Sequence, residues 1–354
     1  MSPENVQEEV QYEEQCGRMF ERICPELAAE TKQSVAAFKF GGSSLLGAKR
    51  MLHAANLVKE AARTSRVAVV VSAMKGVTDQ LLAIAKLADS GNLAEAKRKA
   101  DSLLRLHADV LSELQLDELD HQRVWQDLRL LGRDLLHQCS GDFTSPSLPS
   151  SALHDSLASF GERFSARLFA AALDALDVPA VPVTSSEFVL TCDTFRDAKP
   201  HMDETRRRGR DLLQPLLETG VVPVVTGFVG ATRDGRVTTL GRNSSDYSGA
   251  IIAHVVDADE LVIWTDVDGV YTANPNESSE ARLLHELSYE EAHALAAAGA
   301  KVLHANVLPL AAETEMVVWV RNTFNPDFRG TRIGPAAQEM QNGNSSQNSQ
   351  RGAA

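Results

Sequence analysis

Residues 38–44 read Phe-Lys-Phe-Gly-Gly-Ser-Ser, and they directly follow the apolar run Val35-Ala36-Ala37. The pattern predicts a strand that runs through a lysine and opens into a loop of two glycines and two hydroxyl residues. Glycines let a backbone approach a phosphate closely, and the N–H groups of such a loop and of the helix behind it attract negative charge. Lys39 adds a mobile positive charge at the same place. An ordinary turn has a similar composition, so the later loops decide between the two interpretations.

Apolar runs and helical spacing alternate along the chain. The segment 66–71 is almost continuously apolar, which is typical of a parallel strand that is covered on both faces. Residues 46–64 have helical spacing and lie between this strand and the strand that runs through Lys39. The three segments therefore predict a βαβ unit with a right-handed connection. Further helices are predicted at 78–140, 153–176, 203–218, 247–256 and 288–299, a loop at 140–151, and strands at 180–183, 221–225, 260–264 and 316–320. This alternation predicts an α/β three-layer sandwich with an open, mostly parallel central sheet.

The composition limits the classes of binding partner and the cellular compartment that we expect for this protein. The 354 residues carry a net charge of −13, which argues against nucleic acid or an anionic membrane as partner. A bound nucleotide needs only a few local cations. The four cysteines form no CxxC pair, the N-terminus has no apolar signal core, and no apolar run approaches a membrane span. We therefore expect reduced thiols and a cytoplasmic protein.

Three regions follow from the pattern. Residues 1–33 are acidic with spaced apolar positions and predict an N-terminal helical extension. Residues 34–333 hold the regular alternation of strands and helices. Residues 334–354 are mostly Gln, Asn, Ser, Gly and Ala, and predict a disordered tail.

Loops of similar chemistry follow the predicted strands. Ligands of open α/β sheets bind at the carboxyl ends of the strands, where such loops meet. Glycine, hydroxyl and charged residues recur in the segments 72–78, 226–230, 238–248 and 265–272. Chance does not readily place so many matching loops at one edge.

Together these loops resemble the amino acid kinase family, and within it the catalytic domain of aspartate kinases. The resemblance covers roughly residues 35–333. It rests on Lys-Phe-Gly-Gly-Ser-Ser, Val-Ser-Ala-Met-Lys-Gly-Val-Thr, Gly-Glu-Arg, Thr-Leu-Gly-Arg-Asn-Ser-Ser-Asp-Tyr-Ser and Trp-Thr-Asp-Val-Asp-Gly-Val-Tyr-Thr. It implies ATP-dependent phosphorylation of L-aspartate to 4-phospho-L-aspartate, the first step of aspartate-family amino-acid biosynthesis. It also implies Mg²⁺ as cofactor, a homodimer, an acceptor-binding part over 34–225 and a nucleotide-binding part over 226–333.

The resemblance assigns the reacting groups to two loops. A carboxylate is already a nucleophile, so the protein's task is to position it and to neutralise charge. Lys39 would bridge the transferring phosphoryl group, and Asp246 would hold Lys39 or organise the phosphate region. Gly41, Gly42 and Ser43 would donate to the phosphates. A solvated lysine at the end of a strand is the plain alternative for Lys39.

Acceptor binding needs a cation for the α-carboxylate and an anion for the ammonium group. Arg242 suits the first role because a guanidinium binds a carboxylate through two hydrogen bonds. Glu162 suits the second, although a glutamate on an amphipathic helix is usually a solvated residue. Further acceptor contacts are expected from Ser72, Thr78 and Ser245.

The nucleotide side would use Thr265, Asp266, Tyr271 and Lys301. Asp266 would bond the ribose and Lys301 the phosphates, although Lys301 could instead cap the preceding helix. Asp268 is equally compatible with a metal shell and with a turn, and no protein metal ligand is assigned.

Two other features have plain interpretations. His304 is expected to be a packed or hydrogen-bonded residue, and the run Arg206–Arg208 a solvated helix face.

Some positions depart from the pattern of aspartate kinases. Asn243 and Ser244 stand where the family has two glycines, and Asn276 stands where it has an arginine. Side chains at the glycine positions narrow the space beside the acceptor, so another amino acid or an N-hydroxylated acceptor is an alternative. A catalytically silent regulatory subunit is another. Aspartate kinases commonly continue into regulatory ACT domains, which are not expected here, so inhibition by lysine or threonine is not expected either.

Overall fold

The computed structural model describes residues 34–139, 149–242, 244–273, 278, 280–297 and 303–335. The predicted extension over 1–33 and the predicted tail from residue 336 onward lie outside the described residues. Asn243 and Lys301 lie outside them as well.

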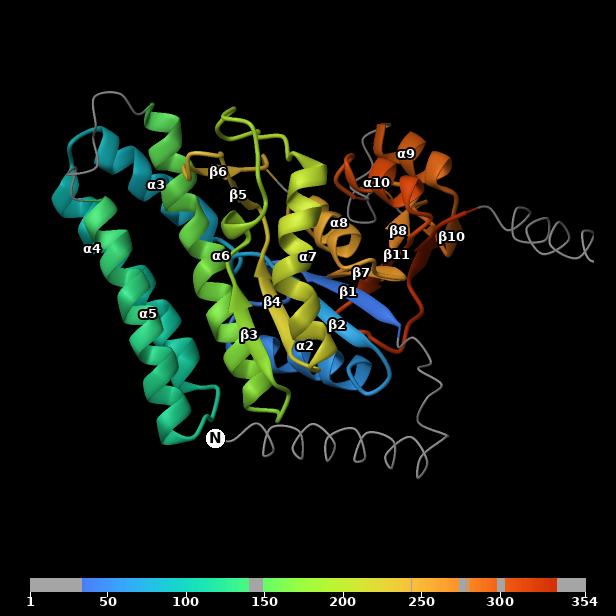
Figure 1. Ribbon diagram of the computed structural model, residues 1–354, viewed down its shortest axis with the longest axis horizontal. Coiled ribbons are helices and arrows are strands. Elements are labelled where there is room, and N and C mark those ends of the chain that lie inside the picture. The colour runs from blue at the N-terminus through green and yellow to red at the C-terminus, as the bar shows by residue number, and fades with distance from the viewer. Residues whose placement is uncertain are drawn as a thin grey trace, which may run out of the picture. The chain divides into compact units, whose positions relative to one another are not determined.

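An eight-stranded sheet forms the centre of the described part (Figure 1). Its strands are, in spatial order, β10 (Glu286–Leu287), β12 (Thr331–Ile333), β11 (Val317–Asn322), β7 (Glu260–Thr265), β1 (Val35–Phe40), β2 (Arg66–Val71), β4 (Val222–Thr226) and β3 (Ala180–Val183). All neighbouring strands pair in parallel except β11 and β12, which are antiparallel. The predicted open, mostly parallel sheet is therefore confirmed.

Helices cover both faces, so the predicted three layers are present. One core contains residues of α2 (Ala48–Ala61), α3 (Val77–Asp89), α4 (Leu93–Ser112), α5 (Glu118–Gln138) and α6 (Ser150–Asp174). The other contains residues of α7 (Met202–Glu218), α8 (Ser245–Val255), α9 (Tyr289–Ala297) and α10 (Val307–Glu313). Because both faces are buried, the strands in the middle of the sheet are mostly apolar, and Lys39 is the one charged side chain inside β1.

Side-chain alternation along β1 decides which face receives the lysine. Ala36, Phe38 and Phe40 belong to the first core, whereas Val35 and Ala37 belong to the second. Successive strand residues point to opposite faces. Lys39 therefore lies on the second face, toward α8.

Several elements were not predicted from the pattern. They are α10, β10, β12, the short 3-10 helix Ser185–Glu187, and the hairpins β5 (Val229–Ala231) with β6 (Val237–Thr239) and β8 (Val270–Tyr271) with β9 (Leu283–Leu284). Strands of two or three residues are too short to show a period. The predicted helical region 78–140 is divided into α3, α4 and α5, with Gly91 at φ 77° and Gln115 at φ 56° in the breaks. Helix α6 begins at Ser150, so residues 150–152 are helical and the predicted loop ends before them.

None of the helices in the described ranges combines the length and the apolar character that a bilayer-spanning helix needs.

Candidate active site at the ends of the parallel strands

Lys39 and Asp246 form an ion pair between the sheet and a helix. The lysine Nζ lies 2.6 Å from Oδ1 of Asp246, and the two side chains are 9% and 21% exposed. Lys39 is the penultimate residue of β1, and Asp246 lies in the first turn of α8. The expected contact between the two side chains is thus present, and it sets a fixed positive charge at the edge where β1 ends. The low exposure of the Lys39 side chain is inconsistent with the alternative of a solvated lysine at the end of a strand.

Gly249 allows α8 to approach β1 closely. A Cβ atom at Gly249 would lie 3.1 Å from Cβ of Lys39 and 3.3 Å from Cδ1 of Leu261. A larger residue would therefore push the helix away from the strand. The sequence interpretation missed this role, although a glycine inside a helix is a signal of close packing.

The glycine loop after β1 packs against the loop after β2. A Cβ atom at Gly42 would lie 2.6 Å from the carbonyl oxygen of Ala73, and Lys75 N–H donates to the Gly42 carbonyl at 3.1 Å. Gly41 N–H donates to the carbonyl of Trp264 at the end of β7, at 3.3 Å. Ser43 follows in the same loop and is half-buried. The loop is therefore held between the ends of the neighbouring strands.

The start of α8 is tied to the loop after β2. Ser72 Oγ donates to Ser245 Oγ at 2.9 Å, so these two predicted acceptor contacts lie side by side. Ser244, at the N-cap position, is fully buried, and its Oγ has no hydrogen-bond partner among the described residues. Thr78 is half-buried in the first turn of α3.

Glu162 is a buried carboxyl group with one free oxygen. It lies on α6 and is 3% exposed; its Oε1 accepts from Ala73 N–H at 3.1 Å, and Oε2 has no partner among the described residues. Burial raises the pKa of Glu162 to about 8. Gly161 allows this approach, because a Cβ atom there would lie 2.6 Å from Cβ of Ala73. A ligand cation beside Oε2 would restore the ionised form.

Arg242 lies at the rim of the site. Its side chain is 81% exposed, and its ion pair is with Asp79 at 3.7 Å, itself 80% exposed. The structure thus leaves most of the guanidinium in solvent, in contrast to Lys39 and Glu162. It follows Gly241, which has φ 94°.

The predicted nucleotide residues lie at and beyond the end of β7. Thr265 ends this strand, Asp266 is exposed, and Tyr271 is half-buried on β8. Thr265 is joined to the next strand of the sheet, because Thr323 N–H donates to its carbonyl at 2.8 Å.

Asp268 has structural partners. Its Oδ1 accepts from the side-chain amides of Asn322 at 2.7 Å and Asn325 at 3.2 Å. These bonds favour the turn interpretation over a metal shell. Within the described ranges there is no group of three or more His, Cys, Asp or Glu residues placed to hold a metal ion.

Two residues that the sequence interpretation missed support the glycine loop. Ser44 Oγ and Thr323 Oγ1 lie 2.7 Å apart, and both residues are fully buried. The bond joins the loop after β1 to the residue after β11. Nothing in the local pattern signals this bond, because the two residues meet only through the fold.

His304 and Tyr247 stack with ring centroids 5.7 Å apart. Burial lowers the pKa of His304, while the nearby Asp246 opposes that shift. This geometry agrees with the expectation of a packed histidine.

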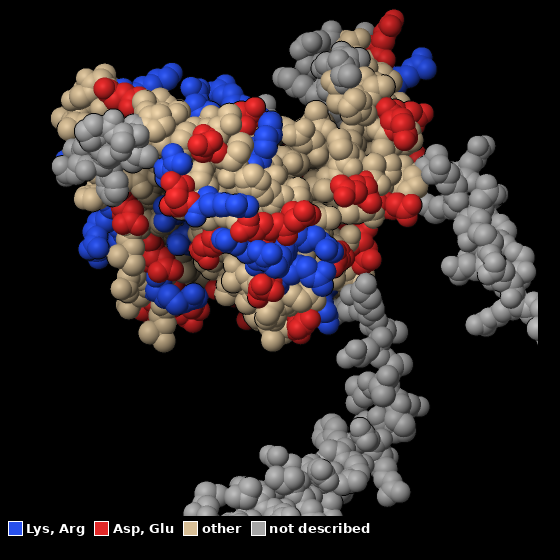
Figure 2. Space-filling view, turned by 45° about the horizontal axis from the view of Figure 1, so that its top comes forward, with Lys and Arg blue, Asp and Glu red and all other residues tan. Residues whose placement is uncertain are grey.

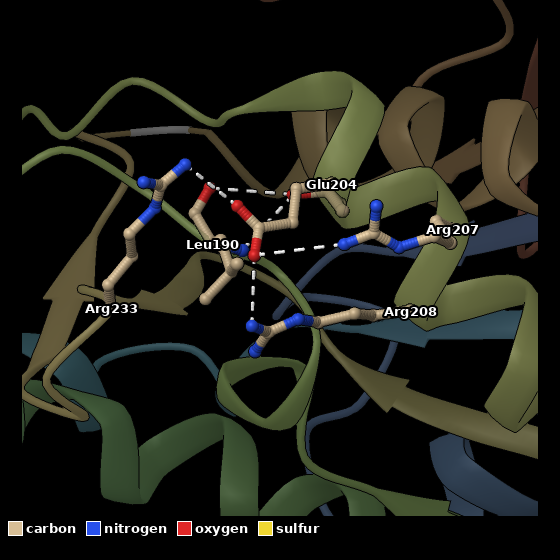
Figure 3. A network of polar contacts seen from close by, with 6 residues as sticks. Leu190, Glu204, Arg207, Arg208 and Arg233 are labelled. Atoms are coloured by element: carbon tan, nitrogen blue, oxygen red, sulfur yellow. Dashed lines mark hydrogen bonds and ion pairs between the residues drawn. The ribbon is translucent and has the colours of Figure 1, made fainter.

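The arginine run on α7 is engaged in local ion pairs (Figure 3). Arg208 and Arg233 each donate to Glu204 at 2.9 Å, and Arg207 lies 4.0 Å from the same carboxylate. Arg206 pairs with Asp257 at 2.5 Å. The arginines are solvent-exposed, as expected, and they also form an ion-pair network. Figure 2 shows basic and acidic side chains next to one another over the middle of the face that it presents.

Comparisons with known proteins agree with this geometry. The sequence model of the amino acid kinase family matches residues 35–322. The chain is 32% identical over 299 residues to the lysine-sensitive aspartokinase 3 of Escherichia coli, and this alignment covers 84% of the chain and 64% of the relative. It is also 32% identical to the chloroplastic aspartokinase 1 of Arabidopsis thaliana, covering 86% of the chain and 52% of the relative.

A crystal structure of E. coli aspartokinase III in complex with aspartate and ADP superposes with a TM-score of 0.74 at 32% identity. The match covers 85% of this chain and 64% of that chain. The chain thus spans less than two thirds of the length of these relatives.

Proposed function

The chain belongs to the amino acid kinase family, and from this premise we propose that it transfers the γ-phosphoryl group of ATP to the side-chain carboxylate of L-aspartate. The observation that carries the proposal is that two buried ionisable groups, each with a different partner, lie at the same edge of the sheet. Lys39 supplies a held positive charge, and Glu162 supplies a free acidic oxygen. The likeness to a kinase crystallised with aspartate and ADP supports the same choice of substrates.

The transfer needs no general base. A side-chain oxygen of aspartate attacks the γ-phosphorus, the bond from that phosphorus to the β,γ-bridging oxygen breaks, and ADP leaves with the electron pair. The products are 4-phospho-L-aspartate and ADP. Lys39 would stabilise the charge on the transferring group, and Asp246 would keep the ammonium group aimed at it.

Phosphate binding would use the glycine loop. The N–H groups of Gly42 and Ser43, together with the start of α8, would donate to the phosphates, whereas the expected donor Gly41 already bonds the carbonyl of Trp264. A side chain at Gly42 would collide with the backbone of Ala73 and Lys75, so the glycine lets the two loops pack closely. Thr265, Asp266 and Tyr271 would hold the nucleoside, as would Lys301, which lies outside the described residues.

The acceptor would lie between Glu162 and the start of α8. Its ammonium group would bond Oε2 of Glu162, and its α-carboxylate would bond Arg242 after that exposed side chain folds over the site. Ser72, Thr78 and Ser245 would donate or accept the remaining hydrogen bonds.

Other expectations stay predictions. Magnesium is expected to accompany ATP, but the described residues offer no cluster of ligands for it, so no step is assigned to it. The dimer and the cytoplasmic location also stay predictions.

A hydroxylamine trapping assay tests the proposed function. Hydroxylamine converts an acyl phosphate to a hydroxamate, so the full chain with ATP should give a hydroxamate that depends on L-aspartate. The panel should include L-glutamate, L-asparagine and an N-hydroxylated amino acid, with ADP release measured alongside. Turnover with another acceptor alone would refute aspartate as the substrate, and no turnover with any acceptor would favour the silent subunit.

A further inference from the structure

A second cavity lies apart from the proposed active site. It has a volume of about 390 Å³ and is bounded by the last residue of α3, the end of α5, the start of α6 and the turn between β5 and β6. Figure 1 shows α3, α6 and the β5–β6 hairpin close together. None of the predicted acceptor or nucleotide residues that the structure describes lines this cavity. The polar residues among its walls are Asp89, Gln138, Ser150, Ser156 and Arg236.

An acidic group is fixed on one wall. Asp89 Oδ2 accepts from Ser150 Oγ at 2.5 Å and lies 2.6 Å from His154 Nε2. Oδ1 has no hydrogen-bond partner among the described residues. The carboxylate is therefore held in place through Oδ2, and Oδ1 is not used by any described residue.

A basic group is fixed on the hairpin wall. The backbone N–H of Arg236 donates to Thr232 Oγ1 at 3.0 Å, and its Nε donates to Asp234 Oδ2 at 2.8 Å. Its guanidinium also lies over the ring of Phe195, 5.4 Å from the ring centre. The Nε contact is an ion pair with Asp234, whereas both terminal nitrogens lack a hydrogen-bond partner among the described residues.

The remaining surface is largely apolar and preformed. Pro149, Ala152, Leu153 and Val237 line it, and the Gln138 side chain is held by a 2.8 Å hydrogen bond from Ser156 Oγ. Small-molecule sites are typically cavities of about 300–1,000 Å³ with apolar walls and a few fixed polar groups. This cavity has that character.

We propose that this cavity is a second ligand site, which takes a free α-amino acid with an apolar side chain. Arg236 would bind the carboxylate of the ligand, Asp89 its ammonium group, and the apolar wall its side chain. A molecule with both charges and an apolar body can contact all three walls, whereas a simple carboxylate or amine contacts only one of the two charged side chains.

The walls of this cavity connect it to the proposed active site. Helix α3 carries Thr78 at its other end, and α6 carries Glu162 further along. Strand β6 leads to Arg242, and Asp155 of α6 holds that strand through two bonds to Thr239, of 2.8 and 2.9 Å. We therefore expect an occupant of the cavity to change the affinity for the acceptor. This regulatory part rests on the proposed function, whereas binding itself does not.

Calorimetric titration of the full chain tests the site without any turnover. The probes are L-valine, L-leucine, L-methionine and L-phenylalanine, with 4-methylpentanoate and 3-methylbutylamine as partial ligands that each lack one charge. At least one amino acid should bind saturably at one site, and the partial ligands should bind at least tenfold more weakly.

Variants locate the binding. Arg236→Gln and Asp89→Asn should each raise the Kd at least tenfold, and Ala152→Phe should abolish binding by filling the cavity. Arg233→Gln is the matched control, because Arg233 lies on the same hairpin outside the cavity, and its Kd should stay unchanged. No saturable binding by any of the four amino acids, or binding that persists in both Arg236→Gln and Asp89→Asn, would overturn the site. These two variants change solvent-accessible groups, so they decide the matter even if Ala152→Phe does not fold.

The regulatory part has its own readout. A saturating probe should change the KM for the acceptor at least threefold in the wild type and not in Arg236→Gln. An unchanged KM in the presence of bound probe would show that the cavity does not regulate the reaction. Binding without any turnover would instead count against the proposed function alone.

Discussion

At the scale of single residues, Lys39 and Glu162 are two buried ionisable groups that differ in whether the protein supplies a partner. Lys39 has its counter-charge in Asp246, whereas one oxygen of Glu162 has no partner among the described residues. Burying a polar group without a partner costs free energy. The sequence indicated both residues, but only the structure shows that Glu162 is buried with Oε2 unpartnered among the described residues.

The state of Glu162 predicts a pH dependence of acceptor binding. With a pKa of about 8, the free carboxyl group is mostly neutral at pH 7, and a bound ammonium group favours its ionised form. We expect the KM for aspartate to fall as the pH rises toward 8, by up to about tenfold per pH unit, and then to level off. Initial rates at saturating ATP measure this.

Glu162→Gln removes the titration and the charge. Its KM for aspartate should rise roughly 100-fold, because truncating one partner of a buried charge pair costs about 2–5 kcal/mol, and it should no longer vary with pH. A pH-dependent KM that persists in this variant would assign the titration to another group.

Arg242→Ala tests the other end of the acceptor. Losing a charge-assisted contact to the α-carboxylate costs roughly 2–4 kcal/mol, so the KM for aspartate should rise at least tenfold while the KM for ATP changes little. The control is Arg233→Ala, another exposed arginine on a different loop. If Arg242→Ala raises the KM for ATP and leaves the KM for aspartate unchanged, the proposed positions of the two substrates are interchanged.

At the scale of elements, the contact between α8 and β1 sets the geometry of the Lys39–Asp246 pair. Gly249→Val places two methyl groups where Lys39 and Leu261 already crowd a Cβ position. Overpacking of this kind costs about 1–3 kcal/mol. We expect a lower stability and a loss of turnover larger than the unfolded fraction explains, measured by denaturant titration and initial rates.

The matched control lies one turn further along α8. Ala253 is also fully buried, and Ala253→Val should lower stability without the extra loss of turnover. Equal specific activity in the folded fractions of both variants would show that the spacing at Lys39 does not matter.

The elements also show what the sequence could and could not predict. The long apolar strands and the periodic helices were predictable, and so was the edge where their loops meet. The β5–β6 hairpin and α10 were not, because such short elements carry no clear period. The bond between Ser44 and Thr323 was out of reach as well, since it depends on β11 lying beside β7 and β1 in the sheet.

At the scale of the whole molecule, a buried histidine makes stability depend on pH. His107 is fully buried on α4, with Nδ1 2.6 Å from the carbonyl oxygen of Leu103 and its ring stacked on Phe164 at 4.4 Å. Burial lowers its pKa from 6.5 to about 4. The unfolded chain therefore binds a proton that the folded chain excludes, and stability is lost as the pH falls through this window.

The size of this effect can be measured. The free energy of unfolding should fall by up to about 3 kcal/mol between pH 6.5 and pH 4 because of His107. Glu162 acts in the opposite sense, because its raised pKa makes the folded chain bind the extra proton and costs stability as the pH rises from 4.5 to 8. Denaturant titrations over this pH range measure both effects. His107→Leu should remove the loss of stability as the pH falls below 6.5, and Glu162→Gln should remove the loss of stability as the pH rises from 4.5 to 8. An unchanged profile in His107→Leu would contradict the assignment.

The most direct test of phosphoryl transfer at this edge of the sheet is the turnover of Lys39→Ala in the hydroxamate assay. The wild type and Lys75→Ala, an exposed lysine in the neighbouring loop, serve as references. Losing a charge contact made in the transition state typically costs several kcal/mol, so Lys39→Ala should retain less than about a tenth of the wild-type kcat, with its circular dichroism spectrum unchanged. A folded Lys39→Ala protein that retains more than about a tenth of that kcat would contradict the account.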